Sequence, residues 1–333
     1  MPSNQDIPTA SPLSEKVLRE RPERFERILG ITVTDFDLLL ERLKAIRLDM
    51  MLKRRVLWEP ERVQRLHERT SQEMATDVCI TLLYQRQYMT QEVLAACFGM
   101  EQGSICTLIK RTEALLPHAL PTPEHVSNAL ATTMEVMPAE TFDNNGLSLV
   151  LDGVEQHTQR PENDVQQRAQ YSGKKKTHTL KTQVLATLTG LILHLSSTMV
   201  GTTHDFKQAK QDTPNQGLRR MFLLVQNKVK LWCDSAYQGM DKRHPRWECF
   251  ISLKAQRNHP LTWADKQTNK ARSKVRVVVE HHIRRIKVYR ICSDRLRKAS
   301  RERHQRRWNI AAGLANLRWL NRPEFTALKQ SWL

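Results

Sequence analysis

The sequence predicts an α+β protein in which a helical N-terminal region precedes a mixed α/β domain. Three features of the 333-residue chain indicate this organisation. Apolar residues recur at helical spacing between residues 21 and 116, and short β-rich apolar runs begin after residue 146. A segment with four prolines, residues 117–145, separates the two parts and predicts a linker. We expect residues 1–20 to be a disordered tail, 146–320 to form the second domain and 321–333 to be a C-terminal tail.

The N-terminal region has the features of a helix-turn-helix at residues 78–116. Helical character covers residues 78–84, 90–98 and 102–116; Thr90 is a suitable N-cap, and Gly99 can supply the left-handed turn between the last two segments. In this motif the second helix lies in the DNA major groove. An ordinary helical bundle has the same spacing and remains an alternative. The candidate DNA-facing residues are Gln102, Ser104, Thr107, Lys110 and Arg111.

The second domain alternates β-rich runs with helical segments. Strands are predicted at residues 147–151, 229–233 and 249–254, with a hairpin of runs 178–188 and 191–200 around Thr189-Gly190. A helix beginning at Asp205 should break at Pro214, and residues 275–290 have a helical apolar stripe. The pattern by itself supports a mixed α/β sheet with flanking helices.

Three acids stand out within this domain. Asp152 and Asp234 directly follow two of the apolar runs, and Glu280 lies among bases on the helical segment. A carboxylate at the end of a buried strand is costly unless it binds something positive, and oxygen ligands suit hard divalent cations. Two metals about 3.5–4 Å apart can hold the attacking and leaving oxygens of a phosphoryl displacement. The alternative is local: the aspartates cap turns, and Glu280 pairs with Arg276 and Arg284 at i±4.

The composition favours a polyanionic partner. The net charge is +18, and residues 284–307 contain 11 Lys or Arg against two acids. This basic segment is too polar for a membrane surface, and we expect no signal peptide, no membrane span and no membrane partner. The six cysteines form no zinc-binding pattern, which indicates reduced thiols in a cytoplasmic protein.

Six motifs follow one another along the second half of the chain: Asp152-Gly-Val-Glu155, Gln159-Arg-Pro161, Tyr171-Ser-Gly-Lys-Lys-Lys-Thr-His-Thr-Leu-Lys-Thr-Gln183, Gly201-Thr-Thr-His-Asp205, Cys233-Asp-Ser-Ala-Tyr-Gln-Gly239 and Val275-Arg-Val-Val-Val-Glu-His-His282. Together with Arg285-Ile-Lys287 they resemble the catalytic domain of bacterial insertion-sequence transposases of the DDE superfamily, from Leu151 to about Asn316. The predicted helix-turn-helix resembles the one that precedes this domain in such transposases.

The resemblance implies an RNase H-like fold with a mixed five-stranded sheet for residues 146–320. It implies that Asp152, Asp234 and Glu280 are the catalytic triad and bind two Mg²⁺ ions, with Mn²⁺ as a possible substitute. The implied activity is binding of terminal inverted repeats, metal-dependent cleavage at the element's ends and joining of 3′ ends to target DNA. The implied partner is double-stranded DNA, bound by a homodimer at the bacterial nucleoid.

The family's helix carries an Arg and a Lys around its Glu, and Arg276 and Lys287 match them. Ser273 stands where some relatives have Tyr, and Arg284 where a Gly is frequent. We expect contacts to the DNA backbone, which are sequence-independent, although a solvated loop is the alternative for the lysine run. The candidates are Lys174, Lys175, Lys176, Lys181, Arg276, Arg284 and Lys287. His204, Asp205 and Tyr237 fall within the matching motifs and are expected to support the site.

Two other functions remain compatible with the sequence. A domesticated or decayed copy would bind DNA without cutting it, although all three acids are present. An RNase H-like endonuclease would hydrolyse DNA without joining ends. Because the same carboxylates serve cleavage and joining, the sequence separates these functions poorly.

Overall fold

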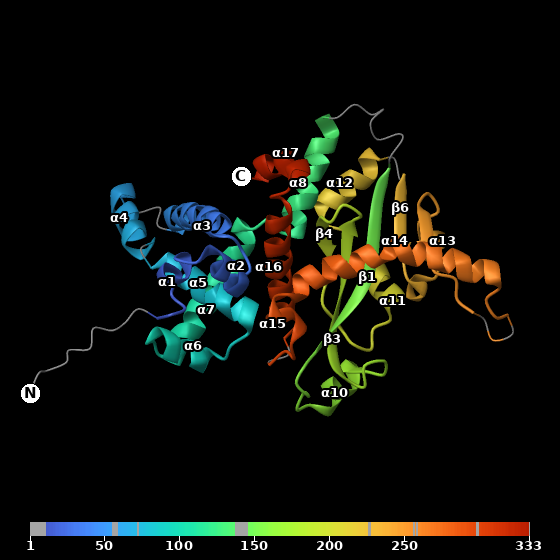
Figure 1. Ribbon diagram of the computed structural model, residues 1–333, viewed down its shortest axis with the longest axis horizontal. Helices are drawn as coiled ribbons and strands as arrows, with labels where there is room; N and C mark the ends of the chain where they lie inside the picture. The colour runs from blue at the N-terminus through green and yellow to red at the C-terminus, as the bar shows by residue number, and fades with distance from the viewer. Residues whose placement is uncertain are drawn as a thin grey trace, which may run out of the picture. The chain divides into compact units, whose positions relative to one another are not determined.

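The computed structural model describes residues 11–54, 59–71, 73–136, 146–225, 228–255, 257, 259–297 and 300–332. The chain divides into two compact units (Figure 1). The first runs to Leu120 and includes Tyr289–Ile291, and the second contains Pro121–Val288 and the chain from Cys292 onward. Within the described ranges, no helix is both long and apolar enough to cross a bilayer.

The first unit is built from helices around α5. These helices are α1 (Glu15–Arg19), α2 (Pro22–Leu29), α3 (Val33–Arg54), α4 (Pro60–Ser71), α5 (Met74–Gln87), α6 (Gln91–Phe98) and α7 (Gln102–Ala119). Every residue of α5 from 77 to 85 is buried, so this helix forms the centre of the unit. The expected tail at residues 1–20 is therefore partly wrong, because α1 forms there and buries Leu18 in the core. Residues 1–10 lie outside the described part.

Helices α6 and α7 have the local geometry expected from the sequence. The Thr90 hydroxyl accepts a hydrogen bond from the Val93 amide at 3.2 Å, which caps α6. Gly99 ends α6 in the left-handed conformation, with φ 62° and ψ 37°, and α7 begins three residues later. That this helix pair is a DNA-binding helix-turn-helix stays a prediction.

The second unit contains a mixed sheet with strand order β2-β3-β1-β6-β7, in which β4 and β5 also pair with β3. Its strands are β1 (Leu147–His157), β2 (Tyr171–Ser172), β3 (Thr177–Thr187), β4 (Ile192–Leu195), β5 (Met199–Val200), β6 (Val229–Cys233) and β7 (Glu248–Ile251). β1 runs antiparallel to β3 and parallel to β6, and β6 runs parallel to β7. The described sheet has seven strands instead of five, because the run at 191–200 splits in two and Tyr171–Ser172 adds a short strand.

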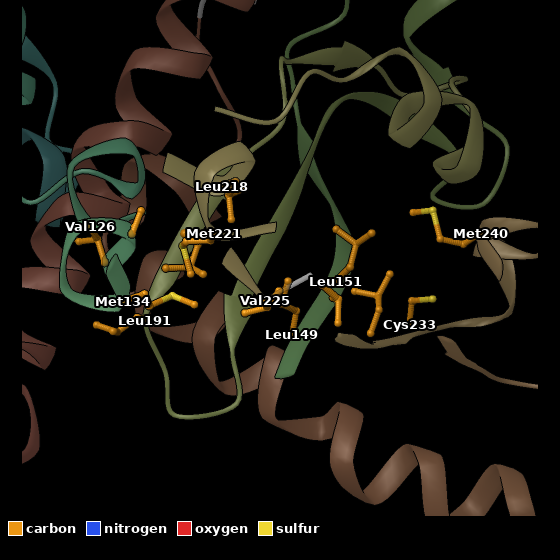
Figure 2. Packing of buried hydrophobic residues seen from close by; sticks show 14 of the residues in the cluster. Val126, Met134, Leu149, Leu151, Leu191, Leu218, Met221, Val225, Cys233 and Met240 are labelled. Atoms are coloured by element: carbon orange, nitrogen blue, oxygen red, sulfur yellow. The ribbon is translucent and has the colours of Figure 1, made fainter. Parts of the chain in front are cut away.

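Helices cover both faces of this sheet. They are α8 (Pro123–Val136), α10 (Asp164–Gln170), α11 (Asp205–Gln211), α12 (Gln216–Leu224), α13 (Met240–Arg243), α14 (Trp263–Lys287), α15 (Arg290–Ser293), α16 (Arg301–Trp319) and α17 (Thr326–Trp332), with 3-10 turns at Ser235–Tyr237 (η1) and Pro323–Phe325 (η2). Figure 2 shows Leu149 and Leu151 of β1 packed with Leu218 and Met221 of α12 in one apolar cluster.

Two segments expected outside the domains belong to this cluster. The expected linker contains α8, whose Val126 and Met134 are buried among the sheet residues. The expected C-terminal tail contains α17, which packs on α8 and buries Leu328. The prolines of residues 117–145 indicated a linker, but Pro123 is the first residue of α8, a position where proline is well tolerated. Residues 137–145 of the expected linker lie outside the described part.

Helix α14 begins 12 residues before the predicted start. Thr262 and Asp265 form a capping box: the Thr262 hydroxyl accepts from the Asp265 amide at 3.1 Å, and the Asp265 carboxylate accepts from the Thr262 amide at 2.9 Å. Residues 263–274 are mostly polar, so an apolar periodicity could not reveal these first turns.

Candidate active site

The parallel pairing of β1 and β6 brings two of the three acids to one place. The last paired residues are Val150 and Trp232, and Asp152 and Asp234 each follow two residues later, on the same face of the sheet as those partners. β1 itself continues to His157 beside β3, so Asp152 lies at the end of one strand pairing and not at the end of its strand. The Asp234 carboxylate also accepts from the Ala236 amide at 2.8 Å and caps η1.

Asp152 lies in an environment that disfavours its negative charge. Burial raises the pKa of its carboxyl to about 6; Arg276 opposes the rise, whereas Asp234 and Asp205 add to it. Arg276 Nη1 lies 3.5 Å from Asp152 Oδ2, and the Gly153 amide donates to Oδ1 at 2.9 Å. A further cation beside Asp152 and Asp234 would therefore be stabilised.

Glu280 reaches the same pocket from α14 but does not join the aspartates. Its side chain is 59% exposed, and its Oε1 lies 3.7 Å from Nη2 of Arg276. Arg276 thus lies between Asp152 and Glu280 as their shared cation. The pocket is open and is lined by Asp152, Gly153, Val154, Glu155, Lys174, Lys175, Glu280, Ile283, Arg284 and Lys287.

The side chains at this place fit a divalent cation in part. Asp152 and Asp234 supply oxygen donors at adjacent positions, which is the ligand chemistry of Mg²⁺ and Mn²⁺. Across the described residues, no three His, Cys, Asp or Glu side chains are close enough together to hold a metal. Glu280 would complete such a set only after Arg276 releases it.

A buried ionic cluster lies on the opposite face of β1. Lys181 Nζ lies 3.2 Å from Asp205 Oδ1 and 3.6 Å from Glu155 Oε1, and it donates to the Thr203 carbonyl at 2.9 Å. Lys181 is only 6% exposed, so the expectation that it tracks the DNA backbone is wrong. Its partner Glu155 had no role in the sequence prediction, because the strand register that sets the two opposite each other cannot be seen in the sequence.

Asp205 and Tyr237 pack tightly behind Asp152. A Cβ at Gly153 would lie 2.5 Å from Asp205 Oδ1, so any larger residue would force Asp205 or β1 to shift. Gln183 Nε2 donates to the Tyr237 hydroxyl at 3.0 Å and to the Asp205 carbonyl at 2.7 Å. Tyr237 is fully buried, and burial together with the nearby carboxylates raises its pKa well above the ordinary value. His204 is exposed and caps α11 through its ring nitrogen, 3.3 Å from the Phe206 amide.

The other basic candidates surround the pocket. Lys174, Lys175 and Arg284 are exposed along its lining, and Lys176 is exposed nearby in a left-handed turn. Lys287 is half-buried, and burial together with Lys175 lowers its pKa. These positions are compatible with phosphate contacts. Arg276 is engaged with both acids, as described above.

The candidate DNA-facing residues of α7 all lie on its exposed side: Gln102, Ser104, Thr107, Lys110 and Arg111. Ile105, Leu108 and Ile109 are buried on the other side. Arg111 forms an ion pair with Asp77 of α5, so its guanidinium also serves the packing of the helical unit.

Comparison with known proteins agrees with this geometry. Residues 151–316 match the DDE superfamily endonuclease family, over a segment that holds Asp152, Asp234 and Glu280. This segment is a DDE superfamily endonuclease domain. A probable transposase for insertion sequence element IS702 from Microchaete diplosiphon is 25% identical over 312 residues, which cover 91% of this chain and 96% of that protein. No solved structure matches the chain significantly. The resemblance to DDE-superfamily insertion-sequence transposases is therefore confirmed.

Proposed function

We propose that this protein is an insertion-sequence transposase that binds terminal inverted repeats, cleaves the DNA there by metal-dependent hydrolysis and joins the 3′ ends to target DNA. The observation that carries the proposal is the pairing of β1 with β6, which sets Asp152 beside Asp234 inside a DDE endonuclease domain. Glu280 lines the same pocket as Asp152 and is the third proposed catalytic residue.

Two Mg²⁺ ions, or Mn²⁺ in their place, are the proposed cofactors. Asp152 and Asp234 would hold them, and Glu280 would join after its release by Arg276. When bound, such ions supply positive charge to the attacking and leaving oxygens of the phosphodiester. The burial of Asp152 supports this role, because a cation relieves the cost of its charge.

The remaining residues of the pocket would position the DNA. Lys174, Lys175, Arg284 and Lys287 surround the acids with positive charge, which suits the phosphates on either side of the scissile bond. The Lys181, Glu155 and Asp205 cluster would hold β1 and β3 rigid behind Asp152, so that the carboxylate keeps its position.

End recognition is assigned to the exposed side of α7. Its polar residues from Gln102 to Lys110 suit contacts with base edges and phosphates in a major groove. Because transposition joins two ends, we propose that a homodimer holds them, at the bacterial nucleoid.

The test is cleavage of a labelled duplex that carries the inverted repeats flanking the protein's own gene. With Mg²⁺, nicking is expected at the repeat boundary, and EDTA should abolish it. Asp152→Asn, Asp234→Asn and Glu280→Gln should each lower the rate by about 10³-fold or more while DNA binding persists, because several kcal/mol of electrostatic stabilisation would be lost. Cleavage at the wild-type rate by any of the three variants would contradict the assignment.

One observation favours a second candidate. Arg276 separates Glu280 from Asp152, which is also what a copy that binds DNA without cutting would show. Tight, metal-independent binding of the repeat duplex without nicking would support this second candidate. The third candidate is an endonuclease that cleaves but does not join. A strand-transfer assay with pre-cut transposon ends separates it from a transposase, because only the transposase would join those ends to target DNA.

A further inference from the structure

The first half of α14 carries a row of exposed lysines that the pocket does not use. Lys266, Lys270 and Lys274 are exposed and follow one another at intervals of four residues. With 100° per residue, the three positions fall within about 80° of one another around the helix, and Arg284 at the pocket falls on the same line as Lys266. We call Lys266, Lys270 and Lys274 the lysine row.

The orientation of α14 is fixed by the contacts of Asn269, Arg272 and Val279. Asn269 Oδ1 accepts from the Leu253 amide at 2.7 Å, and Asn269 Nδ2 donates to the Leu253 carbonyl at 3.0 Å. Arg272 donates to the Ile251 carbonyl, and Val279 is buried against the sheet. Arg272 and Val279 lie on the side of the helix opposite the lysine row, so the contacts of these two residues turn the row toward solvent.

The row has no counter-charge of its own. Between Lys266 and Arg284 the helix contains one acid, Glu280, which is paired with Arg276. Within the part of the chain that the structure describes, none of the three lysines forms an ion pair. Trp263, 76% exposed, and Val277, 41% exposed, lie on the same side of the helix. A row of unneutralised cations with a few exposed apolar groups is suited to a polyanion.

We propose that the lysine row binds backbone phosphates of duplex DNA that extends beyond the cleavage pocket. This proposal rests on the proposed function, since it takes the pocket as the place of cleavage. The helix rises about 27 Å from Lys266 to Arg284, which is the length of about eight base pairs. One helix thus continues the basic lining of the pocket along the duplex. Phosphate contacts carry no sequence information, so the row holds any flanking DNA equally.

The experiment compares the salt dependence of DNA binding by the wild type and by K266Q/K270Q/K274Q. Glutamine has a helix propensity close to that of lysine and an unbranched polar side chain, and it removes the charge. Each lost phosphate contact should make the slope of log Kobs against log [salt] shallower by about 0.9, hence by about 2–3 in all. At about 0.1 M salt the affinity should fall about 100-fold, and by the same factor for the repeat duplex and for a scrambled duplex.

The matched control is K207Q/K242Q/R246Q. These three cations are also exposed but lie on α11, on α13 and just after it. Helices α11 and α13 line a pocket with Leu151 and Leu231, on the face of the sheet opposite Asp152. The control should keep the wild-type slope. Equal slope changes in both triple variants would show an effect of net charge alone and would overturn the proposal.

The outcomes separate this proposal from the proposed function. If the wild type cleaves DNA and the lysine-row variant keeps the wild-type salt slope, the proposed role of the lysine row is overturned and the transposase assignment stands. If the wild type does not cleave yet the slope changes as expected, the row stands as a DNA contact and the cleavage assignment fails. A variant that loses affinity for structured RNA but not for duplex DNA would also overturn the proposal.

Discussion

At the scale of single residues, tight packing at Gly153 and the ion pairs of Lys181 shape the region behind Asp152. A side chain at Gly153 would crowd Asp205, because its Cβ would lie only 2.5 Å from Asp205 Oδ1. Lys181 forms ion pairs with both Asp205 and Glu155, at a position where its own side chain is buried. Both constraints lie behind the proposed catalytic carboxylate, so we expect changes there to alter folding stability and the position of Asp152 together.

Gly153→Ala should destabilise the protein and slow cleavage. The added methyl group would lie 2.5 Å from Asp205 Oδ1, and the required shift should cost about 1–3 kcal/mol of unfolding free energy. Urea unfolding and metal-dependent nicking measure the two effects. Gly173→Ala is the matched control, because no atom lies within 4 Å of its added Cβ. Equal stability of the two variants would show that β1 can move away from Asp205.

Lys181→Met should act on stability and not on DNA binding. It leaves Glu155 and the partly exposed Asp205 without their shared cation, which should cost up to about 3–5 kcal/mol, the loss expected on breaking a fully buried ion pair. Chemical denaturation measures the loss. Lys175→Met, at an exposed lysine in the same motif, should leave stability within about 0.5 kcal/mol. If Lys181→Met instead changed only the salt dependence of DNA binding, the lysine would have to be accessible to phosphate.

The different fates of these lysines show how far the sequence could predict the site. The motifs indicated Asp152, Asp234 and Glu280, and the strand register explains why the two aspartates are adjacent. Lys181 looked like the lysines beside it in the sequence. Its burial depends on its position opposite Glu155 across two strands, a tertiary fact that no local pattern contains.

At the scale of elements, apolar periodicity located the strands better than the helices. The predicted strands at 147–151, 178–188 and 229–233 all form, because each run is rich in apolar or β-branched residues. The start of α14 was missed because its first turns are polar, although the capping residues Thr262 and Asp265 marked it. Helix α8 was hidden among prolines and polar residues, and only packing against the sheet reveals its role.

His282 in helix α14 should make the folding stability of the protein sensitive to acid. His282 is buried, its Nε2 lies 3.1 Å from the Thr187 carbonyl, and burial followed by Arg285 lowers its pKa to about 4. Below about pH 6.5 the unfolded chain binds a proton that the folded chain rejects, so stability falls as the pH drops from 6.5 to 4. The loss should be on the order of 3 kcal/mol.

His282→Gln should remove this loss of folding stability at low pH. The glutamine amide can still donate to the Thr187 carbonyl, and it does not become protonated in this pH range. Denaturation at a series of pH values measures it. His281→Gln, at the exposed neighbour, is the matched control. His304 is also buried, and burial lowers its pKa to about 3, so some acid sensitivity should persist in the variant. An unchanged pH profile in His282→Gln would mean that the imidazole is solvated.

At the scale of the whole molecule, the chain has two compact units and a strongly positive net charge. The division after Leu120 falls close to the predicted end of the helical region, but the second unit begins at once with Pro121 and α8 and not after a linker. The excess of 53 Lys and Arg over 35 Asp and Glu favours a polyanion and does not identify which residues meet it. That assignment needed the exposed sides of α7 and α14.

Removal of divalent metal should affect one unit only. The proposed ligands all belong to the second unit, so Mg²⁺ or Mn²⁺ should raise the unfolding temperature of that unit and leave the helical unit unchanged. At a metal concentration 100 times the Kd the gain should be about 2.7 kcal/mol. Calorimetry with metal and then with EDTA measures it, with Asp152→Asn as the variant that should lose the gain. A shift that persists in Asp152→Asn would mean that the ion binds elsewhere. A shift in the helical transition alone would mean that the proposed carboxylates are not its ligands.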